Sequence, residues 1–361
     1  MLFRSNRGLA ATTFLFLAIY APISALLLSF LSVWTYGLAN RPVLSARRLA
    51  VTCAGILLPV VAYKLGVGVD LEGGGGAVAI PLGLSYYGFR CMHYALERYK
   101  GTLERHGFKE VLGYLFFLPT IVIGPINRFG PFLRDLRRQR WDGALMSEGL
   151  ERILYGYVKI TVIGNFLIAS QFRTWIESWR AEHQALGEYM NIIRYGLNSY
   201  FQFAGFSDIA IGFALLLGYR VIENFNWPYL QTNISAFWRS WHISLTSWCR
   251  DYVYGSVFAV TRSPALGALA TLVVVGLWHE ISVRYLLWGV YHGIGLIVWQ
   301  RFQDVKRYLP TVSNPLGRRA VDGFCILLTA NFVWFSFVLV SQPTLAMAWQ
   351  AYRTVLFWWV A

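Results

Sequence analysis

Two histidines of this chain lie in strongly apolar stretches, where ionisable side chains are rare. His242 lies within residues 233–252, and His279 directly follows the apolar stretch Leu266–Trp278, 37 residues further on. A buried ionisable group in a membrane interior is costly and usually functional, and an imidazole can exchange a proton with a substrate near neutral pH. A lone histidine in an apolar helix is more often a packing residue. His279 departs from this rule, because its separation from His242 leaves just one helix and a turn between the two histidines.

The residues around His242 have the spacing of a single amphipathic helix. Apolar and aromatic side chains recur every three or four positions, at Ile234, Trp238, Trp241, Leu245, Trp248 and Tyr252. Arg239 and Arg250 fall on another face, and His242 lies on the border between the two. We expect this helix to lie at a membrane interface, with its tryptophans in the headgroup layer.

The elements that must position these histidines are predicted to be transmembrane helices. Of the 361 residues, 56% are hydrophobic and 14% are charged, which is about half the charged share of a soluble globular domain. A helix needs roughly 20 apolar residues to cross the hydrocarbon layer. Runs of this kind occur at Leu9–Leu38, Leu49–Val69, Val111–Ile126, Leu150–Ala169, Tyr195–Gly218, Leu266–Trp278, Tyr285–Trp299 and Phe324–Val340.

Two weaker runs, Ala77–Leu96 and Leu345–Val360, either span the membrane or fold partway in and return. The fold class is therefore predicted to be all-α, a polytopic integral membrane protein of about eight to eleven helices. Some helices are expected to be broken or re-entrant around a central tunnel, and prolines inside apolar runs predict broken or tilted helices, at Pro22, Pro59, Pro81 and Pro119. Because no linker is visible, we expect one domain over residues 1–361, with the first helix retained.

The net charge of +14 does not indicate nucleic-acid binding, because the basic residues gather in short gaps between apolar runs. This distribution is typical of membrane topology signals and lipid-headgroup contacts. The densest group, between residues 128 and 140, is interpreted either as a cytoplasmic loop or as a docking surface for an acidic partner. Its arginines are Arg128, Arg134, Arg137, Arg138 and Arg140.

Several motifs together resemble one known family. They are Tyr200-Phe-Gln-Phe-Ala-Gly-Phe-Ser-Asp208, Glu223-Asn-Phe-Asn-Trp-Pro-Tyr229, Phe237-Trp-Arg-Ser-Trp-His-Ile-Ser-Leu245, Arg250-Asp-Tyr252, Gly276-Leu-Trp-His279 and Tyr291-His-Gly293. With Pro81-Leu-Gly-Leu-Ser85 and Gly124-Pro-Ile126 upstream, their order resembles that of the bacterial membrane-bound O-acyltransferases (MBOAT). The similarity extends from about Leu49 onward. The branch it resembles contains alginate O-acetylation proteins and teichoic-acid D-alanyl transferases.

The resemblance implies a tunnel through the bilayer in which an acyl group passes to a hydroxyl. It makes His279 the catalytic histidine and His242 a second active-site histidine. An acceptor hydroxyl is a poor nucleophile, and a neutral imidazole can take its proton as the oxygen attacks a thioester carbonyl. His279 is the predicted base, and His242 is predicted to orient the acceptor or to stabilise the oxyanion.

Further residues in or near these motifs are candidates for substrate binding, although each could equally brace a helix. They are Asn224, Asn226, Trp238, Trp241, Arg250, Asp208, Arg90, His93, Trp278 and Glu280. His292 lies in a predicted Tyr-His-Gly turn and is expected to act behind the site. We expect no metal site. The four cysteines, Cys249 among them, are interpreted as buried small hydrophobic residues.

Two positions depart from the family pattern: Glu280 replaces the usual glycine, and Gln202 replaces a frequent aspartate. Three functions stay open at this stage. The first is an O-acyltransferase. The second is a transporter, although the sequence has no pair of matching halves of the kind that transporters often have. The third is a non-catalytic membrane subunit that passes an acyl group or glycan to a partner enzyme.

The resemblance implies a multi-pass protein of the bacterial cytoplasmic (inner) membrane, with the lipid bilayer as its surroundings. It implies no tightly bound cofactor, and as co-substrate a coenzyme A thioester such as acetyl-CoA or an acyl-carrier thioester. The expected acceptor is a cell-surface polysaccharide, reached directly or through a periplasmic or extracellular acyltransferase. The expected product is an O-acetylated exopolysaccharide, with D-alanyl transfer to a cell-envelope polymer as the alternative.

Overall fold

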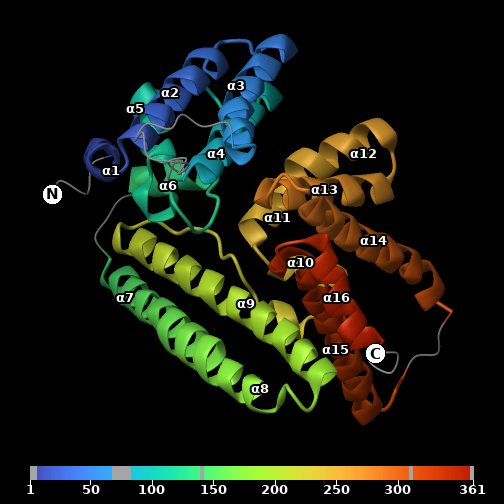
Figure 1. Ribbon diagram of the computed structural model, residues 1–361. Coiled ribbons are helices and arrows are strands. Elements are labelled where there is room, and N and C mark those ends of the chain that lie inside the picture. The colour runs from blue at the N-terminus through green and yellow to red at the C-terminus, as the bar shows by residue number, and fades with distance from the viewer. Residues whose placement is uncertain (1–5, 67–82, 139–141, 309–311, 358–361) are drawn as a thin grey trace. The chain divides into compact units, whose positions relative to one another are not determined.

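The protein is helical throughout the part that the computed structural model describes, which is residues 6–66, 83–138, 142–308 and 312–357 (Figure 1). Within these ranges the one isolated β-bridge joins Phe225 to Trp241. The predicted all-α fold class is confirmed. Among the described residues, five helical segments are long and apolar enough to cross a membrane, namely Pro22–Ala39, Ala46–Lys64, Gly143–Trp179, Gln184–Leu216 and Pro315–Ser341.

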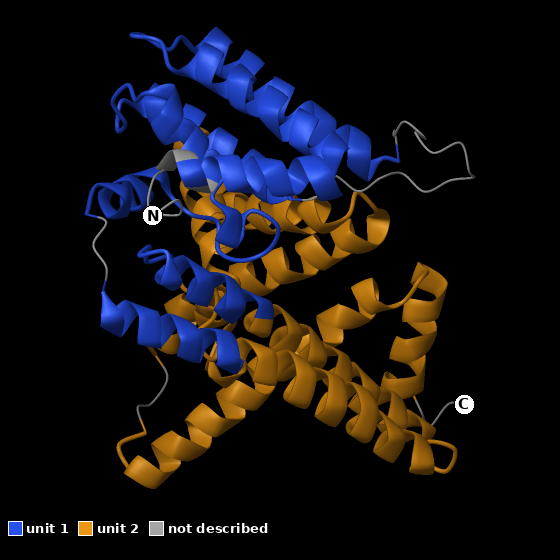
Figure 2. Cartoon of the chain, turned by 90° about the vertical axis from the view of Figure 1, so that its left-hand side faces the viewer, with its two compact units in different colours: residues 1–155, 206–222 blue, residues 156–205, 223–361 orange. Residues whose placement is uncertain are grey.

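The chain divides into two compact units (Figure 2). Unit 1 comprises Met1–Tyr155 and Phe206–Ile222, and unit 2 comprises Gly156–Gly205 and Glu223–Ala361. Two of the three divisions fall inside long helices, between Tyr155 and Gly156 and between Gly205 and Phe206, and the third falls between Ile222 and Glu223, outside any helix. The organisation as a single domain stays a prediction.

Unit 1 is built around three helices that contact one another, α2 (Pro22–Ala39), α3 (Ala46–Lys64) and α4 (Leu84–Lys100). They are preceded by α1 (Asn6–Tyr20) and followed by α5 (Phe108–Leu115), a 3-10 turn (Leu118–Thr120), α6 (Phe129–Arg138) and the first part of α7 (Gly143–Tyr157). The break between α1 and α2 falls at Pro22, as expected, because proline lacks the N–H that would continue the helix.

Three expectations for unit 1 need correction or restriction. The run Val111–Ile126 is not a membrane span, because α5 has eight residues and the chain turns at Pro119. The basic group after residue 128 is not a loop: Phe129–Arg138 forms α6, which buries Phe129, Phe132 and Leu133. Arg140, Pro81 and the start of the run Ala77–Leu96 lie outside the described residues.

Unit 2 begins within a continuous helical segment that includes a π-helix (Val158–Phe172) and α8 (Arg173–Trp179). The long helix α9 (Gln184–Leu216) follows and is shared between the two units. Within unit 2, a Cβ on Gly205 of α9 would lie 2.7 Å from the carbonyl oxygen of Gly156. Small residues at such positions let helix backbones pack closely, which is a common way of joining membrane helices.

The rest of unit 2 consists of a 3-10 turn (Pro228–Leu230), α10 (Ile234–Ser240), α11 (Ile243–Cys249), a short π-helix (Arg250–Tyr254), α12 (Gly255–Thr261), α13 (Pro264–His279), α14 (Val283–Lys306), α15 (Pro315–Ser341) and α16 (Leu345–Leu356). Helices α13 and α14 lie side by side as a hairpin (Figure 1). Gly276 and Gly289 pack against backbone of the facing helix, where a side chain would not fit.

The prediction of one continuous helix over residues 233–252 is wrong. The chain forms α10, breaks at Trp241 and His242, and restarts as α11. The aromatic stripe does not face a headgroup layer, since Trp238 and Trp248 are buried at 5% exposure each. The spacing of three and four residues is helical within α10 and within α11, but the backbone conformation of His242 interrupts the helix between them.

Candidate active site

His242 adopts a backbone conformation that side chains other than glycine rarely adopt. Its φ is 46°, in the left-handed region, which costs an L-residue roughly 1–2 kcal/mol. Its imidazole is 2% exposed. Such strain persists only where neighbouring contacts fix it, and it is common at active sites. The break between α10 and α11 therefore marks His242 as a residue whose placement is enforced.

The contacts that enforce it come from the segment 224–226, which runs antiparallel to 240–243. Asn226 N–H donates to the Ser240 carbonyl at 3.0 Å, and Ile243 N–H donates to the Asn224 carbonyl at 2.9 Å. The fully buried Asn224 side chain accepts from the Ser244 hydroxyl at 2.6 Å. These bonds flank His242 on both sides. We refer to them as the His242 clamp.

Aromatic rings surround the His242 imidazole. Its ring lies 4.7 Å from that of Phe203 and 6.0 Å from that of Trp278, between centroids. His242 lies outside the candidate membrane spans, and burial lowers its pKa, with a further lowering from the nearby His279. Its Nε2 has no hydrogen-bond partner among the described residues. The imidazole is therefore held neutral, with a ring nitrogen able to accept a hydrogen bond from a substrate or donate one to it.

His279 is the last residue of α13 and, unlike His242, is exposed. Its ring lies 4.5 Å from Trp278, 5.8 Å from Tyr285 in a stacked arrangement, and 5.9 Å from Trp288. Since Trp278 contacts the rings of both His242 and His279, the structure brings the two predicted catalytic residues into contact with one indole. Both belong to unit 2.

Glu280 ends α13 immediately after His279. Its carboxylate accepts from Arg284 at 3.1 Å, and Arg284 also donates to the Gln342 carbonyl. Arg284 is not among the residues predicted for the site, although its spacing of four residues from Glu280 is the signal of a helical ion pair. Glu280 is half-exposed beside the exposed imidazole. Its role in substrate binding stays a prediction.

Two tryptophans of the predicted set, Trp238 and Trp241, pack within the aromatic core of unit 2. Trp238 lies 5.1 Å from the ring of His292, and Trp241 stacks on Phe237 at 5.5 Å. His292 does not lie in a turn, as had been expected, but in the middle of α14, where it is fully buried.

Ser336 fixes the orientation of His292. Its hydroxyl donates to the Val333 carbonyl at 2.6 Å and therefore accepts from His292 Nε2–H at 2.8 Å. No pattern in the sequence indicates this partner, because Ser336 belongs to another helix, α15, and lies 44 residues from His292 in the chain.

Three of the predicted substrate-binding residues belong to unit 1 and have structural contacts there. Arg90 is fully buried and donates to the carbonyls of Tyr114, Leu115 and Thr120 near the end of α5. Asp208 pairs with Arg152 at 2.8 Å. These contacts favour bracing roles, and their part in substrate binding stays a prediction.

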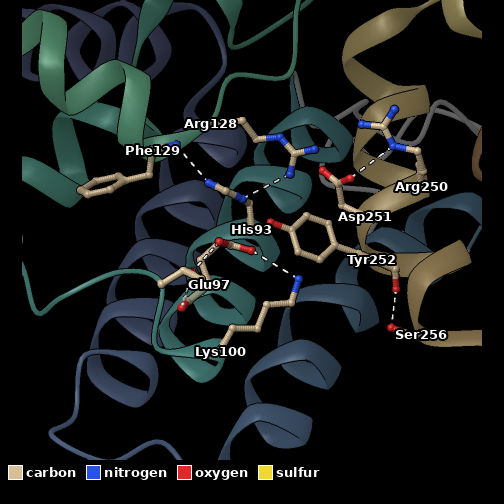
Figure 3. A network of polar contacts seen from close by, with 10 residues as sticks. His93, Glu97, Lys100, Arg128, Phe129, Arg250, Asp251, Tyr252 and Ser256 are labelled. Carbon is tan, nitrogen blue, oxygen red and sulfur yellow. Dashed lines mark hydrogen bonds and ion pairs between the residues drawn. The ribbon is translucent and has the colours of Figure 1, made fainter. Parts of the chain in front are cut away.

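His93 fixes the start of α6. Its Nε2 accepts from the backbone N–H of Phe129 at 3.0 Å, and its Nδ1 lies 3.4 Å from Arg128 (Figure 3). The same view shows the Arg250–Asp251 pair of unit 2, in which the Arg250 Nε lies 3.4 Å from the carboxylate. Gln202, a departure from the family pattern, donates to Asn165 at 2.6 Å within unit 2.

The fold and the site define a class of protein: an all-α, multi-pass membrane protein in which two histidines contact one tryptophan. The chain belongs to the MBOAT, membrane-bound O-acyltransferase family, whose sequence profile matches residues 11–321. This confirms the resemblance that the motifs indicated, and the match includes residues of both units.

Among curated proteins, the chain is 31% identical over 287 residues to the probable alginate O-acetylase AlgI of Pseudomonas aeruginosa, covering 77% of this chain and 52% of that protein. It is 29% identical over 288 residues to the AlgI of Azotobacter vinelandii, covering 77% and 54%. It is 29% identical over 276 residues to the teichoic acid D-alanyltransferase of Bacillus subtilis, covering 72% and 68%. The chain thus spans about half the length of the alginate O-acetylases that it matches.

Proposed function

We propose that this protein is an O-acyltransferase of the bacterial cytoplasmic membrane that moves an acetyl group from a thioester donor to a hydroxyl of a cell-surface glycan. The observation that carries the proposal is that the rings of His242 and His279 both contact the ring of Trp278. Family membership and the similarity to alginate O-acetylases support it.

In the proposed reaction, the His279 imidazole accepts the proton of the acceptor hydroxyl as its oxygen forms a bond to the thioester carbonyl carbon. The carbonyl oxygen takes up negative charge in the tetrahedral intermediate. The carbon–sulfur bond then breaks, and the thiol leaves with the proton that His279 returns. No net oxidation occurs, and the products are an ester and a free thiol.

The difference in exposure between the two histidines assigns their roles. His279 is exposed, so a bulky acceptor such as a glycan can bring a hydroxyl to it. His242 is enclosed and neutral, and its enforced placement suits a group that stabilises the carbonyl oxygen as charge develops, since preorganised donors are most effective there. For that role its Nε2, which has no partner among the described residues, must carry the proton.

The acyl group is the least constrained element of the proposal. The identity to the teichoic acid D-alanyltransferase of Bacillus subtilis, 29%, is close to that of the alginate O-acetylases. D-alanyl transfer from a carrier protein is therefore the second candidate. A non-catalytic membrane subunit would show acyl transfer that does not depend on His279.

The test compares cells with the wild-type gene, with His279→Ala, and with His183→Ala as a matched control on an exposed histidine. Mass spectrometry of surface glycans and lipids should show an added acyl mass in the wild type, and the value of that mass distinguishes an acetyl group from an alanyl group. We expect that mass to disappear in His279→Ala and to persist in His183→Ala, with protein amounts matched. Wild-type acylation in His279→Ala would refute the assignment of the base.

A further inference from the structure

Helix α14 carries three ring-bearing side chains at helical spacing, two of which contact His279 at the end of α13. Tyr285, Trp288 and His292 are separated by three and four residues, so they lie on one face of the helix. The Tyr285 ring stacks on the His279 ring at 5.8 Å, and the Trp288 ring meets it nearly perpendicularly, at 5.9 Å and 84°. The proposed base is therefore packed against this face of α14.

These ring contacts matter because His279 is exposed at a helix end. An exposed side chain changes rotamer readily, whereas a general base must lie within about 2.6–3.2 Å of the group whose proton it accepts. An edge-to-face contact has a preferred geometry, so a Trp288 ring that keeps its place limits the orientations open to the imidazole. The precision of the base therefore depends on what holds Trp288.

Trp288 belongs to a buried cluster of three rings. It is 6% exposed, and its ring lies 4.7 Å from that of His292, which is fully buried. Trp238 packs against both, 5.8 Å from Trp288 and 5.1 Å from His292. The ring contacts thus lead from His292 through Trp288 to His279.

The rotation of the His292 ring is set by one hydrogen bond. Its Nε2–H donates to the Ser336 hydroxyl at 2.8 Å, and that hydroxyl donates onward to the Val333 carbonyl at 2.6 Å. Among the described residues, the other ring nitrogen, Nδ1, has no hydrogen-bond partner. Because Ser336 is fully buried and belongs to α15, the bond ties the imidazole of α14 to a second helix.

We propose that His292 is a positioning residue of the acyl-transfer site: held by Ser336, it keeps Trp288 against His279 and so orients the base for proton transfer. The inference rests on the proposed function, because it concerns the base of that reaction. The competing role is that His292 only joins α14 to α15. Tyr291, the preceding residue, separates the two roles, because its hydroxyl donates to the Phe332 carbonyl of α15 at 3.0 Å.

The test uses the full chain in nanodiscs, with variants of these two hydrogen bonds. His292→Leu removes the ring, His292→Gln keeps an N–H donor near the place of Nε2, and Ser336→Ala keeps the ring but removes its acceptor. Tyr291→Phe is the matched control, because it deletes one hydrogen bond to α15 and keeps the ring stacked on Phe332 at 4.3 Å. Trp288→Leu, alone and combined with His292→Leu, tests the route through the indole.

Acyl-transfer kinetics with matched amounts of folded protein give the first readout. We expect kcat to fall by about tenfold or more in His292→Leu and by about threefold in Ser336→Ala, because a displaced base loses much of the advantage of proximity. KM should change by less than about twofold, and kcat should stay within about twofold of the wild type in His292→Gln and Tyr291→Phe. The double variant should be no slower than Trp288→Leu alone, since residues that act through one another are not additive.

The second readout needs no turnover. The NMR signal of the His279 ring, in protein labelled at histidine and assigned with His279→Ala, reports the rings packed around the imidazole. We expect this signal to move in His292→Leu, in Ser336→Ala and in Trp288→Leu. It should stay in place in Tyr291→Phe.

Equal kcat values for His292→Leu and Tyr291→Phe would overturn the proposal, because His292 would then serve only to join the two helices. So would a His279 signal that His292→Leu leaves unmoved, or a further loss of kcat when His292→Leu is added to Trp288→Leu. If His292→Leu does not fold, the comparison of Ser336→Ala with Tyr291→Phe decides in the same way. A His279 signal that moves as expected in a protein that transfers no acyl group would uphold the positioning of the ring and refute only the proposed function.

Discussion

Replacing His242 tests whether its backbone conformation and its imidazole serve separate purposes. Three variants are informative: His242→Gly, His242→Ala and His242→Asn. All remove the ring contacts with Phe203 and Trp278. Glycine and alanine both delete the imidazole, so the difference in stability between these two variants comes mainly from the backbone at φ 46°.

The left-handed conformation costs alanine roughly 1–2 kcal/mol. Glycine avoids that cost but loses roughly 0.5–1 kcal/mol more in chain entropy on folding. The net free energy of unfolding should therefore be about 1 kcal/mol higher for the glycine variant than for the alanine variant. Asparagine tolerates the left-handed region better than alanine does, so its stability should lie closer to that of glycine.

The rate of acyl transfer should depend on the presence of the imidazole and not on the free energy of unfolding of the variant. Loss of one preorganised donor lowers kcat by about 100-fold to 1000-fold, and we expect a loss of this size in the glycine and alanine variants alike. The assays are thermal unfolding in detergent and acyl transfer with matched amounts of protein. If the glycine variant retained more than a third of the wild-type rate, the catalytic role of the imidazole would be refuted. If the alanine variant were as stable as the glycine variant, the energetic cost of the left-handed backbone at residue 242 would be refuted.

Three further predictions concern the same region. Burial lowers the pKa of His242 below 6.5, so as the pH falls the unfolded chain takes up a proton at this residue before the folded chain does. The temperature of the unfolding midpoint should therefore decrease as the pH drops below 6.5, and it should decrease less steeply in His242→Gly. Asn224→Ala leaves the buried Ser244 hydroxyl without its acceptor and should cost about 1–3 kcal/mol. Asn226→Ala is the stability control: Asn226 contacts Ser240 through its backbone N–H, so this variant should lose less free energy of unfolding. Cys249→Ala should leave acyl transfer nearly unchanged, since the thiol is buried at 1% exposure; loss of transfer in that variant alone would indicate an acyl-cysteine intermediate.

The sequence by itself determined that the protein crosses a membrane and that it is all-α, and it indicated His242 and His279 as the candidate catalytic residues. These properties depend on local composition and motif order: an apolar run such as Phe324–Val340 predicts a span wherever it lies in the fold, and the structure has α15 there. The family profile over residues 11–321 confirms the resemblance on which the roles of His242 and His279 were based.

The sequence did not reveal the break at His242, because periodicity reports side chains and not backbone dihedral angles. Residues 234–252 fit a helical spacing on both sides of the break. What interrupts the helix is the pairing of residues 224–226 with residues 240–244, which is a tertiary contact. The tertiary structure likewise decided that Arg90 donates to backbone carbonyls and that Arg239 and Arg250 share a pocket. The helix break, the Arg90 hydrogen bonds and the shared pocket all depend on contacts between segments far apart in the chain, and local sequence patterns do not report such contacts.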